Sequence, residues 1–284
     1  MLGAIFFMRV LITGGSGFIG RALVSTLLNS HQVFVYTHKT AVENNLSFPP
    51  TVTVLTADSD FPKVDAIINL SGEAIDKSFL TRNRIASIIN SRLHTIKLLK
   101  QKYQNDFPKI FIQASATGIY KDSNEELTEN GSFNNNFYAK LVTQIENGAL
   151  ALLSKDCFVY LARLGVVVGN GGGIVKNLKY LPRPYFLMGN NYIPYITLED
   201  TALAFKFLLE HHSLCSFDKP YQIVNFCSDK YLTLNELLKL CKPQSKIAIP
   251  CPKFILRLDK RGHLLLVDHK VKPAFLLKQG FKFS

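Results

Sequence analysis

The chain has 284 residues, of which 47% are apolar, so it is long and apolar enough to bury a substantial core. No apolar run approaches the ~20 residues needed to cross a bilayer, and the apolar start lacks the features of a signal peptide. The net charge is +12, and five cysteines without CxxC spacing or a nearby histidine cluster indicate reduced thiols and no metal site. We therefore expect a cytoplasmic globular protein without a membrane partner.

The first predicted elements are a strand, a tight turn and a helix within "RVLITGGSGFIGRALVSTLL". The β-branched run ends at Thr13, and glycines follow at Gly14, Gly17 and Gly20. Such glycines permit a sharp turn, the approach of a pyrophosphate and close packing of helix on strand, while the helix N-terminus offers free N–H groups. The predicted cofactor-binding residues here are Gly14, Gly15, Ser16, Gly17, Phe18 and Ile19. A turn without a ligand is the alternative.

Strands and helices then alternate along the chain. We predict strands at 31–39, 51–58, 65–72, 109–116 and 157–169, with helices at 79–102 and 136–153. This alternation predicts an α/β protein with a Rossmann-like, doubly wound parallel sheet, whose ligand lies at the carboxyl ends of the strands.

The pattern changes after Gly169, where glycine-, proline- and aromatic-rich segments interrupt the alternation. We predict a cofactor-binding domain at 1–169 and a small C-terminal substrate lobe at 170–284, with a segment at about 195–226 returning to the sheet. Residues 241–284 carry ten lysines and arginines against two aspartates. This excess indicates either a solvated basic surface or attraction of a polyanion or phosphorylated substrate; no aromatic-interleaved motif of a nucleic-acid binder is present.

The turn, followed by "INLSGEAI", "SATGIY", "EELTEN", "RLGVVVGNGGGIV" and "LLKQGFKF", resembles the extended short-chain dehydrogenase/reductase family. It is most similar to the atypical branch labelled "epimerase family protein" or nucleoside-diphosphate-sugar epimerase. The resemblance implies a Rossmann fold that binds NAD(P) and a C-terminal substrate lobe, but it identifies no substrate.

The residues at the end of the second predicted strand determine the preference for NAD or NADP. The residues there are Thr37, His38 and Lys39, without the carboxylate that binds a free ribose 2′-hydroxyl. Since a lysine attracts the 2′-phosphate, we expect NADP rather than NAD.

A second cofactor-binding loop is predicted after the fourth strand, at Leu70, Ser71, Gly72 and Glu73. Glu73 matches the acidic residue of the branch's "AGE" motif, which implies either a position facing the nicotinamide or substrate, or a structural capping role. In the next helix, Arg84, Ser91 and Arg92 match the branch's "R…SR" pattern, either as anion ligands or as surface charges.

The family's catalytic dyad is a tyrosine with a lysine four positions later, assisted by a Ser or Thr hydroxyl. Here Tyr138 is followed at that spacing by Val142, and Lys140 lies on another face of the helix. The candidate catalytic residues are therefore Ser115, Tyr138 and Thr117, with a tyrosine that lacks its usual cation.

Two main functions follow from this pattern. The first is an NADP-binding oxidoreductase or epimerase-like enzyme that acts on a small carbonyl or nucleotide-sugar substrate. The alternative is an NADP(H)-binding regulatory or redox-sensing protein without efficient turnover, because the dyad is broken. A nucleic-acid-binding module that uses the basic C-terminal region is a weaker third hypothesis.

Overall fold

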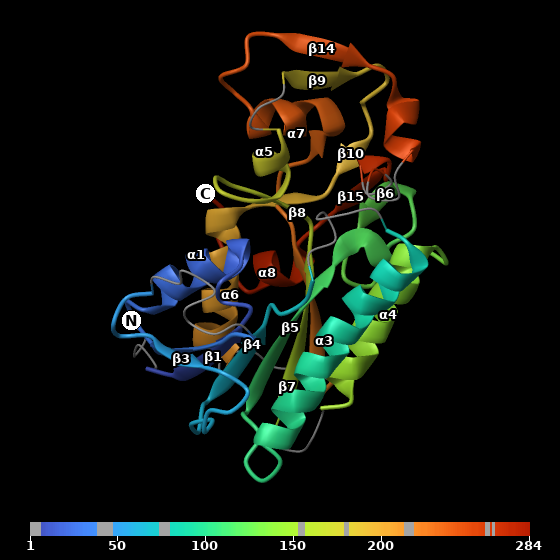
Figure 1. Cartoon of the computed structure of the whole chain (residues 1–284). Helices are drawn as coiled ribbons and strands as arrows, with labels where there is room; N and C mark the ends of the chain where they lie inside the picture. Colours follow the sequence, from blue (N-terminus) through green and yellow to red (C-terminus); the bar gives the residue numbers. More distant parts are fainter. Residues whose placement is uncertain are drawn as a thin grey trace.

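The computed structural model describes residues 7–38, 48–73, 80–152, 157–178, 182–212, 219–258, 262 and 265–284. Its centre is a seven-stranded, entirely parallel sheet (Figure 1). In spatial order the strands are β3 (Thr53–Leu55), β2 (Gln32–Tyr36), β1 (Arg9–Thr13), β4 (Ala66–Asn69), β5 (Ile110–Ala116), β7 (Phe158–Leu164) and β12 (Tyr221–Phe226). The strand order reverses between β1 and β4, which is the switch point where doubly wound sheets bind ligands. The predicted fold class is confirmed.

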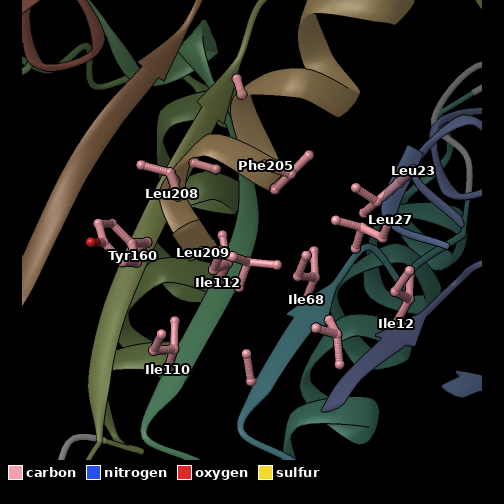
Figure 2. Packing of buried hydrophobic residues seen from close by; sticks show 14 of the residues in the cluster. Ile12, Leu23, Leu27, Ile68, Ile110, Ile112, Tyr160, Phe205, Leu208 and Leu209 are labelled. Atoms are coloured by element: carbon pink, nitrogen blue, oxygen red, sulfur yellow. The ribbon is translucent and has the colours of Figure 1, made fainter. Parts of the chain in front are cut away.

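Helices cover both faces of this sheet. The main ones are α1 (Phe18–Leu27), α3 (Arg82–Lys102), α4 (Phe137–Leu150) and α6 (Leu198–His211). Because side chains alternate along a strand, Ile12 faces α1 and α6 while its neighbour Leu11 packs on the α3 and α4 side. Figure 2 shows the first face, where Ile12 and Ile68 lie beside Leu27 of α1. Strands buried on both faces explain the continuous apolar runs in the sequence.

Several observed strands are shorter than predicted, and the strand predicted at 157–169 is divided in two. Residues 157–169 form two strands, β7 in the main sheet and β8 (Val166–Val168), which pairs with β11 (Tyr195–Thr197) in a separate small sheet. The break falls at Gly165, where a Cβ atom would lie 2.7 Å from the carbonyl oxygen of Pro194. The chain leaves the main sheet here because the backbone of another segment passes directly against it.

The remaining elements are short, and several of them build a second, smaller core. They are η2 (Thr117–Ile119), β6 (Ser123–Leu127), α5 (Gly173–Asn177), β9 (Arg183–Phe186), β10 (Tyr192–Ile193), β13 (Leu232–Thr233), α7 (Leu234–Cys241), β14 (Ala248–Cys251), η4 (Lys253–Arg257), β15 (His269–Val271) and α8 (Ala274–Lys278). The second core includes Val168, Phe186, Tyr195 and Leu237. In Figure 1, β9 and β14 lie at the outer end of this region, farthest from the main sheet.

Among the described residues, no helix is long and apolar enough to cross a membrane, and no group of three or more potential metal ligands comes together.

Candidate functional site: a glycine turn at the switch point

The glycine turn follows β1 directly. Gly14 adopts φ +72°, in the left-handed region that glycine enters without strain, and Gly17 N–H donates to its carbonyl oxygen at 3.0 Å. A Cβ atom on Gly20 would overlap the same oxygen, so helix α1 packs against the turn only because this position is glycine. Helix α1 then begins at Phe18, with no side-chain cap from Gly17. The first N–H groups of the helix therefore lack intrahelical acceptors and suit a phosphate.

Two neighbouring strand ends form the walls of the turn. A Cβ atom on Gly15 would lie 2.7 Å from the Val35 side chain of β2, and one on Gly14 would lie 2.8 Å from the Leu70 carbonyl group after β4. Leu70 N–H also donates to the Thr13 carbonyl oxygen at 3.1 Å. The structure thus brings the predicted turn and the predicted 70–73 loop together at the carboxyl edge of the sheet.

A second glycine run packs against the first one. Cβ atoms added to Gly172 or Gly169 would collide with or crowd the ring of Phe18, at the start of α1. The sequence predicts this run as an interruption of the alternation and as part of the motif "RLGVVVGNGGGIV", but it does not predict a contact with the first glycine turn. No local pattern in the sequence predicts this contact, because Phe18 and the glycines at 169 and 172 are far apart in the chain and meet only in the folded structure.

The end of β2 holds the predicted determinants of cofactor choice. Thr37 is buried and its N–H donates to Leu55 O at 3.0 Å, while His38 Nδ1 lies 3.2 Å from the hydroxyl of Tyr36. Burial, together with the nearby His94, lowers the pKa of His38, which favours a neutral ring in the ligand-free protein. Lys39 lies outside the described residues.

Buried polar side chains connect the neighbouring strands β1, β4 and β5 next to the glycine turn. Thr13 Oγ1 donates to Asn69 Oδ1 at 2.5 Å, and Asn69 Nδ2 donates to Gln113 Oε1 at 2.7 Å. Asn69 Oδ1 also accepts from Ser71 N–H at 3.2 Å, which holds the loop that follows β4. All of these side chains are buried, so the hydrogen bonds are needed to offset their desolvation. Sequence reasoning missed this network, although each member is a polar residue within or just after an apolar strand.

Glu73 is bound by the first turns of α3. Its carboxylate pairs with Arg84 and accepts from Ser87 Oγ at 2.7 Å, while its backbone N–H donates to Ser91 Oγ and its carbonyl oxygen accepts from Arg92, both at 3.1 Å. These contacts favour the structural interpretation of Glu73; a position facing the cofactor stays a prediction. Burial and the charge of Arg84 lower the pKa of Arg92 to about 10.

The contact between Arg92 and the 70–73 loop requires a glycine at position 72. Its φ is +153°, and a Cβ atom would lie 2.6 Å from the guanidinium carbon of Arg92. The residues of the R…SR pattern therefore bind the 70–73 loop to α3, Arg84 through the Glu73 side chain and Ser91 and Arg92 through the Glu73 backbone.

Ser115 belongs to a buried network. Its hydroxyl donates to Glu146 Oε1 at 2.7 Å, and Arg163 holds the same carboxylate with two bonds of 2.8 Å, one from Nε and one from Nη2. Nη1 of Arg163 donates to the Tyr120 hydroxyl at 3.0 Å, which donates in turn to Asn225 at 2.7 Å. Burial of Tyr120 raises its pKa to about 12, even though Arg163 acts in the opposite direction.

The other two catalytic candidates contact different elements. Thr117 is buried and donates to the carbonyl oxygen of Leu164 at 3.3 Å. Tyr138 packs in an apolar cluster between α3 and α4 that includes Ile88 and Ile145. Val142, at the position of the dyad lysine, belongs to another apolar cluster with Tyr120. The hydrogen bonds of Ser115 and Thr117 go to different partners, Glu146 and Leu164, and the catalytic roles of Ser115, Thr117 and Tyr138 stay predictions.

A parallel sheet in this strand order, with a glycine turn and a bare helix N-terminus at its switch point, defines a Rossmann-type dinucleotide-binding fold. The model of the NAD dependent epimerase/dehydratase family matches residues 10–223, so the chain belongs to that family, and the resemblance seen in the sequence is confirmed.

Relatives align over nearly the whole chain. Human epimerase family protein SDR39U1 is 29% identical over 98% of this chain and 96% of its own length. Epimerase family protein ML0860 of Mycobacterium leprae is 27% identical over 96% of this chain and 91% of its own length. The crystal structure of human SDR39U1 (isoform 2) with NADPH superimposes with a TM-score of 0.81 at 26% identity, covering 98% and 95% of the two chains. The dTDP-glucose 4,6-dehydratase DesIV of Streptomyces venezuelae, at 19% identity, has a TM-score of 0.73 over 98% and 92% and shares the fold.

Proposed function

We propose that this protein binds NADP(H) at the glycine turn and acts as an epimerase-like oxidoreductase on a small carbonyl or nucleotide-sugar substrate. The observation that carries the proposal is the uncapped N-terminus of α1 at the switch point, which is positioned by close packing at Gly14, Gly15 and Gly20, where any Cβ atom would collide with the turn or its walls. The pyrophosphate would rest on the first N–H groups of α1. The human relative crystallised with NADPH supports the choice of cofactor.

When bound, the nicotinamide supplies a site that accepts or donates hydride. The chain itself has to supply proton transfer, and Ser115 and Glu146 offer a route. Ser115 is partly exposed while Glu146 is buried, and the serine already donates its proton toward the carboxylate. A substrate hydroxyl that donates to Ser115 Oγ would pass its proton to the serine as the serine proton moves to Glu146. Tyr138 and Thr117 are the other candidates for this step.

A second candidate function is NADP(H) binding without turnover. The observation that favours it is the apolar cluster around Val142, which occupies the position from which a lysine would lower the tyrosine pKa. The two candidates differ in one measurement, because only the first predicts hydride exchange between bound cofactor and a substrate.

The test of cofactor binding is the melting temperature with and without NADPH or NADH. A ligand at 100 times its Kd stabilises the native state by about 2.7 kcal/mol. Gly17 has extended backbone (φ −75°, ψ 177°) that alanine also adopts, and a Cβ atom there would lie 3.2 Å from the Gly14 carbonyl oxygen, so Gly17→Ala should lower the ligand-free melting temperature much less than Gly20→Ala and should weaken the NADPH shift. Gly20→Ala is the matched control, since its Cβ would clash within the turn and should lower the melting temperature without ligand. If neither nucleotide shifts the transition, the proposed function is wrong.

Cofactor preference has its own test. Lys39→Asp should reverse the preference for NADPH over NADH, since an aspartate repels a 2′-phosphate and accepts from a free 2′-hydroxyl. An unchanged ratio of the two affinities would remove Lys39 from the proposal.

A further inference from the structure

The outer end of the C-terminal lobe exposes large apolar side chains. We call this surface the lobe tip; it consists of Tyr185, Leu187, Met188, Phe254, Ile255 and Leu258. Met188 is 82% exposed, Leu258 75% and Phe254 61%. Single exposed apolar residues are ordinary, but a group of this size at one end of a lobe indicates an interaction surface.

The two segments that carry the lobe tip lie side by side. Strands β9 and β14 pair in parallel, with Tyr185 opposite Pro250. Beyond the strands, Leu187 N–H donates to Cys251 O at 3.3 Å, and Lys253 Nζ donates to Met188 O at 3.4 Å. Both strands lie at the outer edge of the molecule, away from the main sheet (Figure 1).

The turn that presents Leu187 and Met188 is held from below. Asn235 of α7 accepts from Phe186 N–H and donates to Phe186 O, both at 2.9 Å, and its own N–H donates to Gly189 O at 3.2 Å. Met188 has φ +62°, a conformation that a long side chain without a local hydrogen bond adopts only at a cost. The side chains of Leu187 and Met188 are therefore exposed to solvent, while the backbone that carries them is held by hydrogen bonds to Asn235.

The charge of the lobe tip identifies the kind of partner. Segments 182–193 and 242–258 contain five lysines and arginines and no aspartate or glutamate. A second copy of this surface would bring like charges together, which disfavours self-association. The complementary partner is anionic and also offers an apolar environment for the side chains.

We propose that the lobe tip is a docking surface for an anionic lipid bilayer. Lys246 and Arg257 are exposed and suit lipid phosphates, while Met188 and Phe254 would enter the boundary between headgroups and acyl chains. The apolar side chains come from a strand, a turn and a 3₁₀ helix, an arrangement that a fluid bilayer accommodates more readily than a folded acidic protein. The sequence-based expectation of no membrane partner rested on the lack of a span, and peripheral docking requires none.

The experiment is co-sedimentation of the full chain with phosphatidylcholine vesicles, with and without phosphatidylserine. We expect binding only to vesicles that contain phosphatidylserine, weakened by added salt. Met188→Asn is the most informative variant, because asparagine tolerates positive φ and should keep or raise the melting temperature while it weakens binding. Phe254→Ser should weaken binding about tenfold. Lys246→Glu with Arg257→Glu should weaken it by about 25-fold or more, at about fivefold per lost charge.

Matched controls come from elsewhere on the surface. Leu203→Ser changes an exposed leucine of α6, and Lys97→Glu with Lys100→Glu reverses two exposed charges of α3; both should bind vesicles as the wild type does. The proposal is overturned by equal binding to neutral vesicles, by no binding to either kind, or by controls as damaging as the lobe-tip variants. Two other results would also overturn it. The first is that the wild type binds polyglutamate and the lobe-tip variants do not. The second is that the wild type forms a concentration-dependent dimer and these variants stay monomeric. Vesicle binding is measured without cofactor or substrate, so its outcome does not depend on the proposed cofactor function.

Discussion

Arg163 and Glu146 form a two-pronged ion pair in the interior, with Nε to Oε1 and Nη2 to Oε2 both at 2.8 Å. Arg163, on β7, is fully buried, and Glu146 reaches it from α4. Burial by itself lowers the pKa of Arg163, but the hydrogen bonds and charge of Glu146 raise it above its usual value. The pair thus places the Glu146 carboxylate directly behind the partly exposed Ser115, which donates to it.

Glu146→Gln should destabilise the protein strongly, because it leaves the Arg163 charge buried without its counter-ion. Breaking one side of such a pair costs about 3–5 kcal/mol, which corresponds to a fall of roughly 10 °C in melting temperature. Thermal unfolding measures the effect. Glu125→Gln, at an exposed carboxylate of β6, is the control and should change the stability little. A Glu146→Gln protein as stable as the wild type would show that the pair contributes no net stability.

Val142→Lys restores the spacing of the dyad, and the sequence alone suggests that it raises turnover. The structure adds a cost, because Val142 is 4% exposed and packs with Ile119 and Tyr120. A lysine buried there loses roughly 3 pKa units, or about 4 kcal/mol of stability. Urea unfolding should show this loss, with Val142→Met as the control for size. If Val142→Lys and Val142→Met are equally stable, the ammonium group reaches solvent and the cluster is more open than the structure shows.

Ser115→Ala and Tyr138→Phe distinguish two of the three candidates for proton transfer. If the protein oxidises NADPH with any substrate of a carbonyl or nucleotide-sugar panel, Ser115→Ala should lower kcat by about 10²–10⁴-fold, since it removes the route to Glu146. Tyr138→Phe keeps the ring that packs against α3 and should change kcat little. Steady-state kinetics with NADPH binding measured in parallel provides the test. The opposite ranking would assign the proton transfer to Tyr138.

Buried histidines should make the protein less stable as the pH falls. Burial lowers the pKa values of His31, His212 and His269 below the 6.5 of an unfolded histidine. Between 6.5 and the lowered values the unfolded chain binds more protons than the folded one, so stability is full above pH 6.5 and decreases below it. Melting temperatures from pH 7.5 to 5 should show this fall, and His269→Gln should make it shallower.

A control for the histidine effect is Gln104→Ala, an exposed position without a titrating group, which should leave the pH dependence as it is. A wild-type melting temperature that stays constant or rises from pH 7 to 5 would contradict the prediction.

The sequence by itself determined the glycine turn, the order of the first strands and helices, and the absence of a lysine one turn from Tyr138. These features are local: a β-branched run, a glycine at a sharp turn and the spacing of residues on a helix are set by neighbours within about one or two turns of chain. For the same reason the helix beginning near residue 80 and the one beginning near 137 were predicted close to their observed positions.

The tertiary structure decided what these elements contact. The break at Gly165 depends on the backbone of Pro194, and the second glycine run depends on Phe18. Glu146 faces Ser115 and Arg163 rather than solvent because α4 lies on β5 and β7, and the lobe tip exists only because β9 and β14 pair across more than sixty residues of chain. Contacts between distant segments depend on how whole layers pack, and no local pattern encodes that packing.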